Sequence, residues 1–158
     1  MSIVEYSINN LSPKDDTLLN GVRNVLEKID RKTPGRSYRL AVLNELQSIG
    51  WSGKISLEQG SKSSIDGIKS GVGLVVQLGN QKSGLLSIMD LEYMYVKGKI
   101  SSGVFITQTN AQAVQRNSIR NPDTTSNGNL ISLERSILDL ELYSEFLKCP
   151  LKIIAIDC

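Results

Sequence analysis

An α/β domain, with a central mixed β-sheet flanked by helices, is the architecture expected for this sequence. Amphipathic segments of helical length alternate along the chain with short apolar segments of strand length. The segment VGLVVQL (72–78) carries the strongest strand pattern, since its apolar residues repeat with a period of two. A chain of 158 residues can bury a core without a metal or a disulfide. We therefore expect a single domain over 1–158.

Two helices are predicted in the first third of the chain. Ser12 and Pro13 form a helix start, and apolar residues then recur at helical spacing, which predicts a helix over 13–30. The segment RKTPGRS interrupts this pattern, and a second amphipathic helix is predicted over 37–49. The short segments KISL and SSID resemble extended chain and lead through a glycine-containing turn into the strand 72–78.

The second half of the chain continues the alternation of helices and strands. Apolar spacing predicts a helix over 83–97, a buried strand over 103–107, a helix over 132–147 and a closing strand over 151–156. Between them, the segment 108–131 is rich in amides and basic residues, and we expect a long loop there. Loops of such length are commonly functional or mobile.

Composition limits the chemistry that the chain can perform. It contains no histidine, which excludes Ser-His-Asp and Cys-His catalysis and the usual mixed zinc sites. Two cysteines cannot form a four-thiolate site within one chain. Any hydrolysis would therefore use carboxylates, lysine and a hard metal ion such as Mg²⁺. The formal net charge of +2 permits nucleic-acid binding but is too small to argue for it.

The chain carries no pattern of membrane insertion or secretion. No apolar run approaches the ~18 residues of a membrane span. The first residues, MSIVEYSINN, lack a basic leader followed by an apolar stretch. We therefore expect a cytoplasmic protein with no membrane partner, in which Cys149 and Cys158 are reduced thiols.

The second face of strand 72–78 is nearly bare, since it carries only Val75 and Gln77 among glycines. Asp66 precedes the strand by a short turn. In metal-dependent nucleases, an aspartate at a strand end and an acid-x-(Lys, Glu or Gln) triplet on the next strand surround one divalent ion. Asp66, followed after eight residues by Val75-Val76-Gln77, has the spacing of that arrangement.

This pattern resembles the BglII/BamHI group of type II restriction endonucleases, within the PD-(D/E)xK nuclease fold. The BglII-type motif is aspartate, eight residues, Glu-Val-Gln, an apolar residue, Ser or Gly, and asparagine. The chain carries Asp66, eight residues and VVQLGN, which ends at Asn80. The resemblance covers about 38–156, because the helix LAVLNELQSIGW and the order of the later elements also match.

The resemblance implies Mg²⁺-dependent hydrolysis of phosphodiester bonds in duplex DNA by a homodimer that recognises a short palindromic site. It also suggests a site with a GATC core. Asp66 would bind the metal and Gln77 would complete the active centre. Asp66 and Gln77 are otherwise an ordinary turn residue and a solvated strand residue.

The same resemblance implies that the glycines beside Val75 and Gln77 let DNA and metal approach the backbone, and it suggests candidate DNA contacts. Asn80 would face the DNA, where asparagine suits adenine in the major groove. The polar segment contains further candidate contacts, Arg116, Asn117, Arg120 and Asn121, and its arginines would contact phosphates or guanine edges. Without DNA, these residues are ordinary parts of a strand end and a solvated loop.

Val75 departs from the motif, because it stands where the family has its metal-binding glutamate and a valine cannot ligate a metal. Four explanations are open. Val75 is an inactivating substitution, the protein is a natural pseudo-nuclease, another acid (Glu45, Glu58 or Glu92) supplies the ligand, or the resemblance is misleading. With Val75, the chain is expected to bind its site and to cleave poorly or not at all. The alternatives to a nuclease are a DNA-binding module without catalysis and an α/β domain that binds no nucleic acid.

Overall fold

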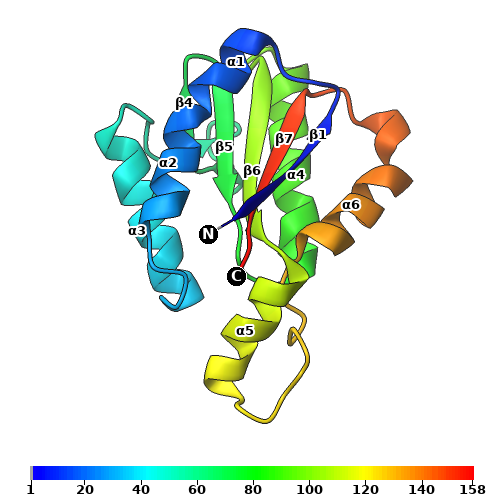
Figure 1. Cartoon of the computed structure of the whole chain (residues 1–158). Helices are drawn as coiled ribbons and strands as arrows, with labels where there is room; N and C mark the ends of the chain where they lie inside the picture. Colours follow the sequence, from blue (N-terminus) through cyan, green and yellow to red (C-terminus); the bar gives the residue numbers. More distant parts are fainter. Residues whose placement is uncertain (1) are drawn as a thin grey trace.

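The computed structural model describes residues 2–158, and a five-stranded sheet runs through its centre (Figure 1). The strand order is β1-β7-β6-β5-β4. The neighbours β5, β6 and β7 are parallel, whereas β1 and β4 pair antiparallel at the two edges. These strands are β1 (Ile3–Ile8), β4 (Gly67–Lys69), β5 (Val72–Val76), β6 (Ser102–Gln108) and β7 (Leu151–Ile156). The expected mixed sheet is confirmed.

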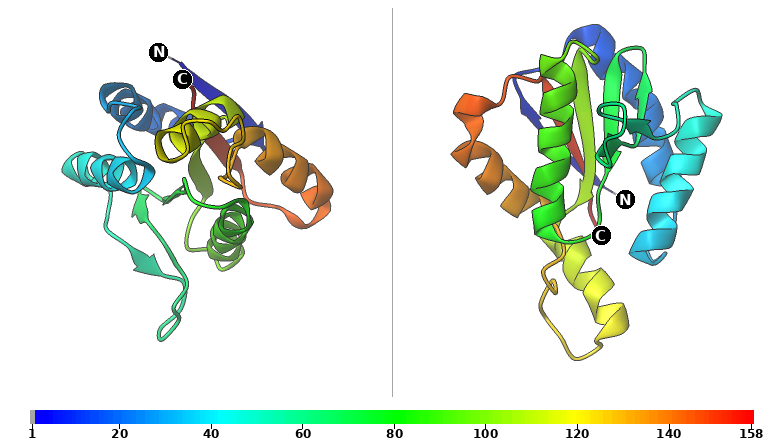
Figure 2. Two further views of the ribbon diagram at one scale, coloured as in Figure 1. Left: turned by 90° about the horizontal axis from the view of Figure 1, so that it is seen from below. Right: turned by 180° about the vertical axis from the view of Figure 1, so that it is seen from behind.

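Helices cover both faces of this sheet. The first three helices lie over one face, and α4 and α6 lie over the other (Figures 1 and 2). The helices are α1 (Pro13–Leu18), α2 (Asn20–Lys28), α3 (Gly35–Ser48), α4 (Gln81–Val96), α5 (Asn110–Arg120) and α6 (Leu133–Leu142), with a short 3₁₀ helix, η1 (Ser144–Phe146). No helix within residues 2–158 is long and apolar enough to cross a membrane.

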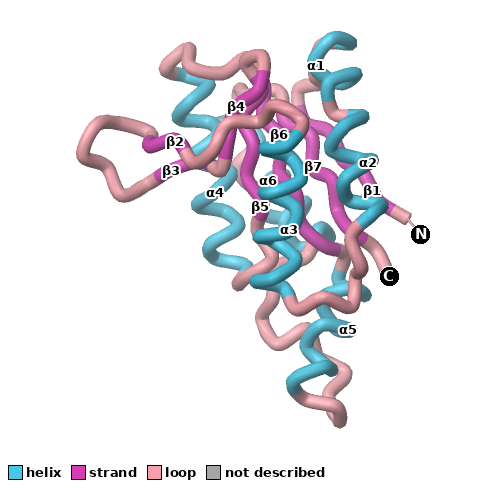
Figure 3. Tube along the Cα trace, turned by 90° about the vertical axis from the view of Figure 1, so that its left-hand side faces the viewer, coloured by secondary structure: helices cyan, strands magenta, loops and turns pink. Residues whose placement is uncertain are grey.

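Two parts of the chain extend from this layered body. The strands β2 (Ile55–Ser56) and β3 (Ser64–Ile65) form a small hairpin that extends to one side in Figure 3. Helix α5 follows β6 and projects beyond the end of the sheet (Figure 1). The molecule therefore presents a hairpin and a helix away from its core.

Strand β5 separates two apolar cores, as the alternation of its residues predicts. Val72, Leu74 and Val76 pack in the cluster that includes α2 and α3. Val75 packs in the opposite cluster with residues of α4 and α6, such as Leu91. Successive side chains of β5 thus point to opposite faces, and all five residues of the strand are buried.

Gly73 contradicts the expectation that the glycines of this face admit DNA or metal. A Cβ atom on Gly73 would lie 2.9 Å from Ile100 Cδ1 and 3.1 Å from Leu91 Cδ2. Leu91 belongs to α4, so the missing side chain makes room for this helix. At Gly73, the bare face is therefore a packing surface.

Two elements differ from the sequence expectation. The expected loop 108–131 contains α5, which forms because Thr109 caps it by accepting a hydrogen bond from Gln112 N at 3.2 Å. The buried side of α5 includes Gln112 and Arg116, so apolar periodicity does not reveal the helix. Residues 3–8 form β1, whose pairing with β7 is a contact between opposite ends of the chain.

Two predicted helices are shorter or divided in the structure. The segment predicted as one helix over 13–30 is split at Leu19 into α1 and α2. The helix predicted over 132–147 ends at Leu142 and is followed by η1. The other predicted helices and strands lie within a few residues of their expected positions.

The first turn of α5 is anchored to the chain end. Thr109 Oγ1 donates a hydrogen bond to Asp157 Oδ1 at 2.6 Å. Gln112 Nε2 donates to Arg31 O at 3.4 Å. The far end of the helix instead contacts the segment that follows it, where Asn117 Nδ2 donates to Ser126 O at 2.9 Å. The base of α5 is thus held by the body of the protein.

The two cysteines should differ in reactivity, because Cys149 is buried and Cys158 is exposed. Burial, with a smaller contribution from the Glu92 carboxylate, raises the pKa of the Cys149 thiol to about 12. Since the thiolate is the reactive form, a disulfide reagent at pH 8 should titrate one thiol in the folded protein and two in urea. Rapid modification of both thiols without urea would contradict the buried position of Cys149.

Candidate functional site

An open cavity of about 410 Å³ lies where α3 faces β5. Asp66 reaches it from the junction of β3 and β4, and Val75 and Gln77 reach it from β5 and the residue after its end. The lining residues are Arg39, Leu43, Gln47, Lys54, Ser64, Asp66, Val75, Val76, Gln77 and Ser87. The three residues of the sequence motif are therefore brought together around one cavity.

Asp66 is fixed by the backbone of β5 and by Arg39. Its N–H donates to Leu74 O at 2.8 Å, and its Oδ2 accepts a hydrogen bond from Val76 N at 2.8 Å. Its Oδ1 forms an ion pair with Arg39 Nη2. Arg39 Nε in turn donates to Val76 O at 3.0 Å. Carboxylate, guanidinium and the backbone of Val76 thus form one closed set of contacts.

Val75 and Gln77 contribute no charge to the cavity. Val75 is 5% exposed, and it lies opposite Phe105 of β6. Gln77 is held at both its backbone and its side chain, since its N–H donates to Ile106 O at 2.9 Å and its Oε1 accepts from Gly79 N at 3.0 Å. The only carboxylate among the residues that line this cavity belongs to Asp66.

The three acids considered as substitute ligands do not line the cavity. Glu92 is 6% exposed, and its two oxygens accept from Lys148 N and Cys149 N, each at 2.8 Å. Glu58 accepts from the Tyr93 hydroxyl, and Glu45 is exposed on α3. Within residues 2–158, no group of three or more acidic, cysteine or histidine residues is placed to hold a metal ion.

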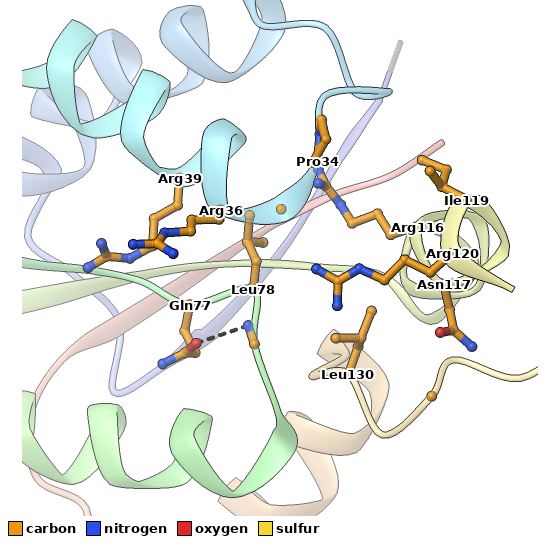
Figure 4. Close-up of a pocket in the computed structure, with 13 residues that line it drawn as sticks. Pro34, Arg36, Arg39, Gln77, Leu78, Arg116, Asn117, Ile119, Arg120 and Leu130 are labelled. Atoms are coloured by element: carbon orange, nitrogen blue, oxygen red, sulfur yellow. Dashed lines mark hydrogen bonds between the residues drawn. The ribbon is translucent and has the colours of Figure 1, made fainter.

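A second cavity, of about 390 Å³, shares Arg39 and Gln77 with the first (Figure 4). It lies between the start of α3, the turn before α4 and the exposed side of α5. Four arginines line it, two from α3 and two from α5: Arg36, Arg39, Arg116 and Arg120. No acidic residue lines it, so its charge suits an anion such as a phosphate group.

Arg116 joins α5 to α3. It is 6% exposed, its guanidinium lies 4.8 Å from the centre of the Tyr38 ring, and its Nη1 donates to Thr33 O at 2.8 Å. Burial lowers the pKa of its guanidinium. Its Nε and Nη2 atoms are buried without a protein partner among the described residues. Arg116 thus supports the cavity wall and still carries unused donors.

The other candidate DNA contacts occupy different environments. Arg120 is exposed at the rim of the second cavity. Asn117 braces the segment after α5 through Ser126. Asn80 is the N-cap of α4, and its Oδ1 accepts from Ser83 N at 2.9 Å. This bond uses the amide oxygen of Asn80 in the fold.

The sequence motif did not point to Arg36 and Arg39. A signal was nevertheless present, because Arg39, Leu43 and Gln47 repeat at intervals of four residues in the predicted helix 37–49. Such spacing places the three side chains on one face of α3, and all three line the first cavity.

Comparison with known proteins identifies the family and agrees with the fold. The family model described as restriction endonuclease BglII/BglIII matches residues 11–156. A solved structure, titled as restriction endonuclease BglII complexed with a DNA 16-mer, is similar with a TM-score of 0.75 and 14% sequence identity. The similarity covers 98% of this chain and 78% of that chain, and at this identity it shows the fold. No curated protein matches the chain. The match over residues 11–156 shows that the chain belongs to the BglII/BglIII restriction endonuclease family.

Proposed function

We propose that this chain binds duplex DNA at a short specific site and that Val75 impairs its centre for phosphodiester cleavage. The observation that carries the proposal is the placement of Asp66 and Gln77 beside a cavity lined by four arginines, in a chain of a restriction endonuclease family. The DNA in the solved structure of similar fold supports the same partner.

The residues around Val75 do not fit a resident Mg²⁺ ion. Mg²⁺ requires near-octahedral oxygen ligands, commonly with one or two carboxylates. Here Asp66 provides the only lining carboxylate, and its Oδ1 is paired with Arg39. The Val75 side chain offers no oxygen. We therefore assign Mg²⁺-dependent hydrolysis to the form with glutamate at position 75, in accordance with the family to which the chain belongs.

We propose that the DNA-binding form is a homodimer on a palindromic site, because twofold protein symmetry suits twofold DNA symmetry. A recognition sequence with a GATC core is part of this proposal and rests on the resemblance of the Asp66–Asn80 motif. With its Oδ1 occupied by Ser83, Asn80 would contribute its Nδ2 donor to a base acceptor.

The arginines are assigned to the DNA backbone and base edges. Exposed Arg36 and Arg120 can reach a ligand directly, whereas Arg116 is buried and would act by holding α5 against the start of α3, beside the same cavity. Phosphate contacts release counterions from DNA, so binding should weaken as salt increases.

Fluorescence anisotropy with labelled duplexes in EDTA tests this proposal. Palindromes with and without a GATC core are compared over a range of salt concentrations. The Arg120→Gln variant should bind roughly fivefold more weakly, with the salt slope reduced by about one. Lys14→Gln is the control, because this substitution also removes one positive charge. Lys14 is exposed on α1, far from α5 (Figure 1). Absence of salt-dependent binding to every duplex would refute the proposed function.

A further inference from the structure

The oxygen atoms beside Val75 are already bound to a cation of the protein itself. Arg39 Nη2 pairs with Asp66 Oδ1, and Arg39 Nε donates to Val76 O at 3.0 Å. One guanidinium thus bridges a carboxylate and a backbone carbonyl. A small divalent ion at this position would need these same oxygens, because the neighbouring side chain is a valine.

The charges of this site balance without a metal. A site with two carboxylates has a charge of −2, which one divalent cation neutralises. In this chain the second carboxylate is absent, and the single positive charge of Arg39 neutralises Asp66. The loss of one carboxylate at position 75 and the positive charge of Arg39 therefore leave the site neutral without a metal.

We infer that Arg39 replaces the divalent cation in this site, so that the chain accepts a DNA phosphate beside Asp66 without bound metal. This inference rests on the proposed function for its DNA partner. Without Arg39, the Asp66 carboxylate would repel a phosphate until an added cation neutralised it.

The position of Arg39 suits this role. Its side chain is 37% exposed, whereas that of Asp66 is 13% exposed, so the guanidinium forms the accessible side of the pair. Arg39 lines both cavities, and Figure 4 shows it reaching from α3 on the same side as Arg36. The two contacts use its Nε and Nη2, and a guanidinium has further donors on Nη1 for a phosphate oxygen. Lys54 is the other basic residue lining the first cavity, and no ion pair joins it to Asp66 in the described residues.

Direct measurement of Mn²⁺ binding tests the replacement without DNA. Isothermal titration compares the parent chain, Val75→Glu, and Val75→Glu combined with Arg39→Gln or with Lys14→Gln. The parent should show no binding up to millimolar Mn²⁺. The variant that lacks Arg39 should bind about tenfold more tightly than Val75→Glu, and the Lys14 control should equal Val75→Glu. Tight Mn²⁺ binding by the parent, or equal affinities of the Arg39 and Lys14 double variants, would overturn the inference.

DNA affinity in EDTA and in Ca²⁺ provides a second readout. The parent should bind equally in both. Arg39→Gln should bind about tenfold more weakly in EDTA and recover in Ca²⁺, whereas Arg39→Gln/Asp66→Asn should recover in EDTA alone. A parent that needs Ca²⁺ to bind, or an Arg39→Gln variant whose binding does not depend on Ca²⁺, would overturn the inference.

The two experiments separate the inference from the proposed function. If no form binds DNA, the proposed function fails and the Mn²⁺ titration still decides the role of Arg39. Thermal melts and circular dichroism establish that each variant is folded. Arg39→Lys keeps the charge but lacks the guanidinium fork, so it should retain metal-independent DNA binding more fully than Arg39→Gln.

Discussion

Replacing Val75 with glutamate should give the chain Mg²⁺-dependent cleavage of plasmid DNA. The new carboxylate would extend from β5 toward the cavity that Asp66 lines, and two carboxylates with a backbone carbonyl suit a divalent ion. We expect a cleavage rate roughly 100-fold or more above that of the parent. This increase corresponds to two tenfold steps in rate, each of which requires ~1.4 kcal/mol of transition-state stabilisation. Conversion of supercoiled to nicked and linear plasmid, with and without Mg²⁺, measures the effect.

Val75→Gln is the matched control for this substitution. Glutamine has nearly the same size and shape as glutamate but carries no negative charge, so the Val75→Gln variant should not cleave DNA. Efficient cleavage by the valine form would contradict the account of Asp66, Val75 and Gln77. Specific DNA binding by Val75→Glu without cleavage would instead favour a natural pseudo-nuclease.

Replacing Glu92 with alanine should destabilise the fold by about 3 kcal/mol. Its carboxylate accepts hydrogen bonds from Lys148 N and Cys149 N, and it links α4 to the segment that precedes β7. Hydrogen bonds to charged groups contribute about 1.5–3 kcal/mol each, and the Cys149 N–H is left buried without a partner. A fall in the melting temperature of about 6–12 °C should be seen by circular dichroism.

Two further variants serve as controls for the Glu92→Ala result. Glu92→Gln retains one acceptor oxygen and should lose about half as much stability. Glu45→Ala removes an exposed acid from α3 and should change the free energy of unfolding by less than about 0.5 kcal/mol. Equal melting of the Glu92 and Glu45 alanine variants would show that the two backbone contacts contribute little.

The sheet and the motif could be predicted because their signals are local. The alternation in 72–78 reflects the two cores that β5 separates, and the spacing from Asp66 to Gln77 reflects the short β4–β5 hairpin. Family membership, expected from that motif, is confirmed. These features depend on neighbouring residues, whose periodicity and spacing can be read along the chain.

The missed features depend on contacts between distant segments. Helix α5 buries Gln112 and Arg116, and an amide and a guanidinium resemble loop residues until Tyr38 and Arg31 are placed beside them. The ion pair of Arg39 and Asp66 joins residues 27 positions apart. The contact of Arg116 with Tyr38 leaves no periodic trace in the sequence. The spacing of Arg39, Leu43 and Gln47 marks one face of a helix, but it does not indicate that Asp66 is the partner of Arg39.

The anchored base of α5 sets where the proposed DNA contact of Arg120 lies relative to the body of the protein. Thr109 ties the first turn to Asp157, so the helix extends from the sheet in a direction set by the body of the protein. Its length, at ~1.5 Å per residue, then fixes how far Arg120 lies from Asp66. Inserting one helical turn before Arg120 would move this residue by ~5.4 Å along the axis of α5, and the outermost of the proposed DNA contacts would move with it.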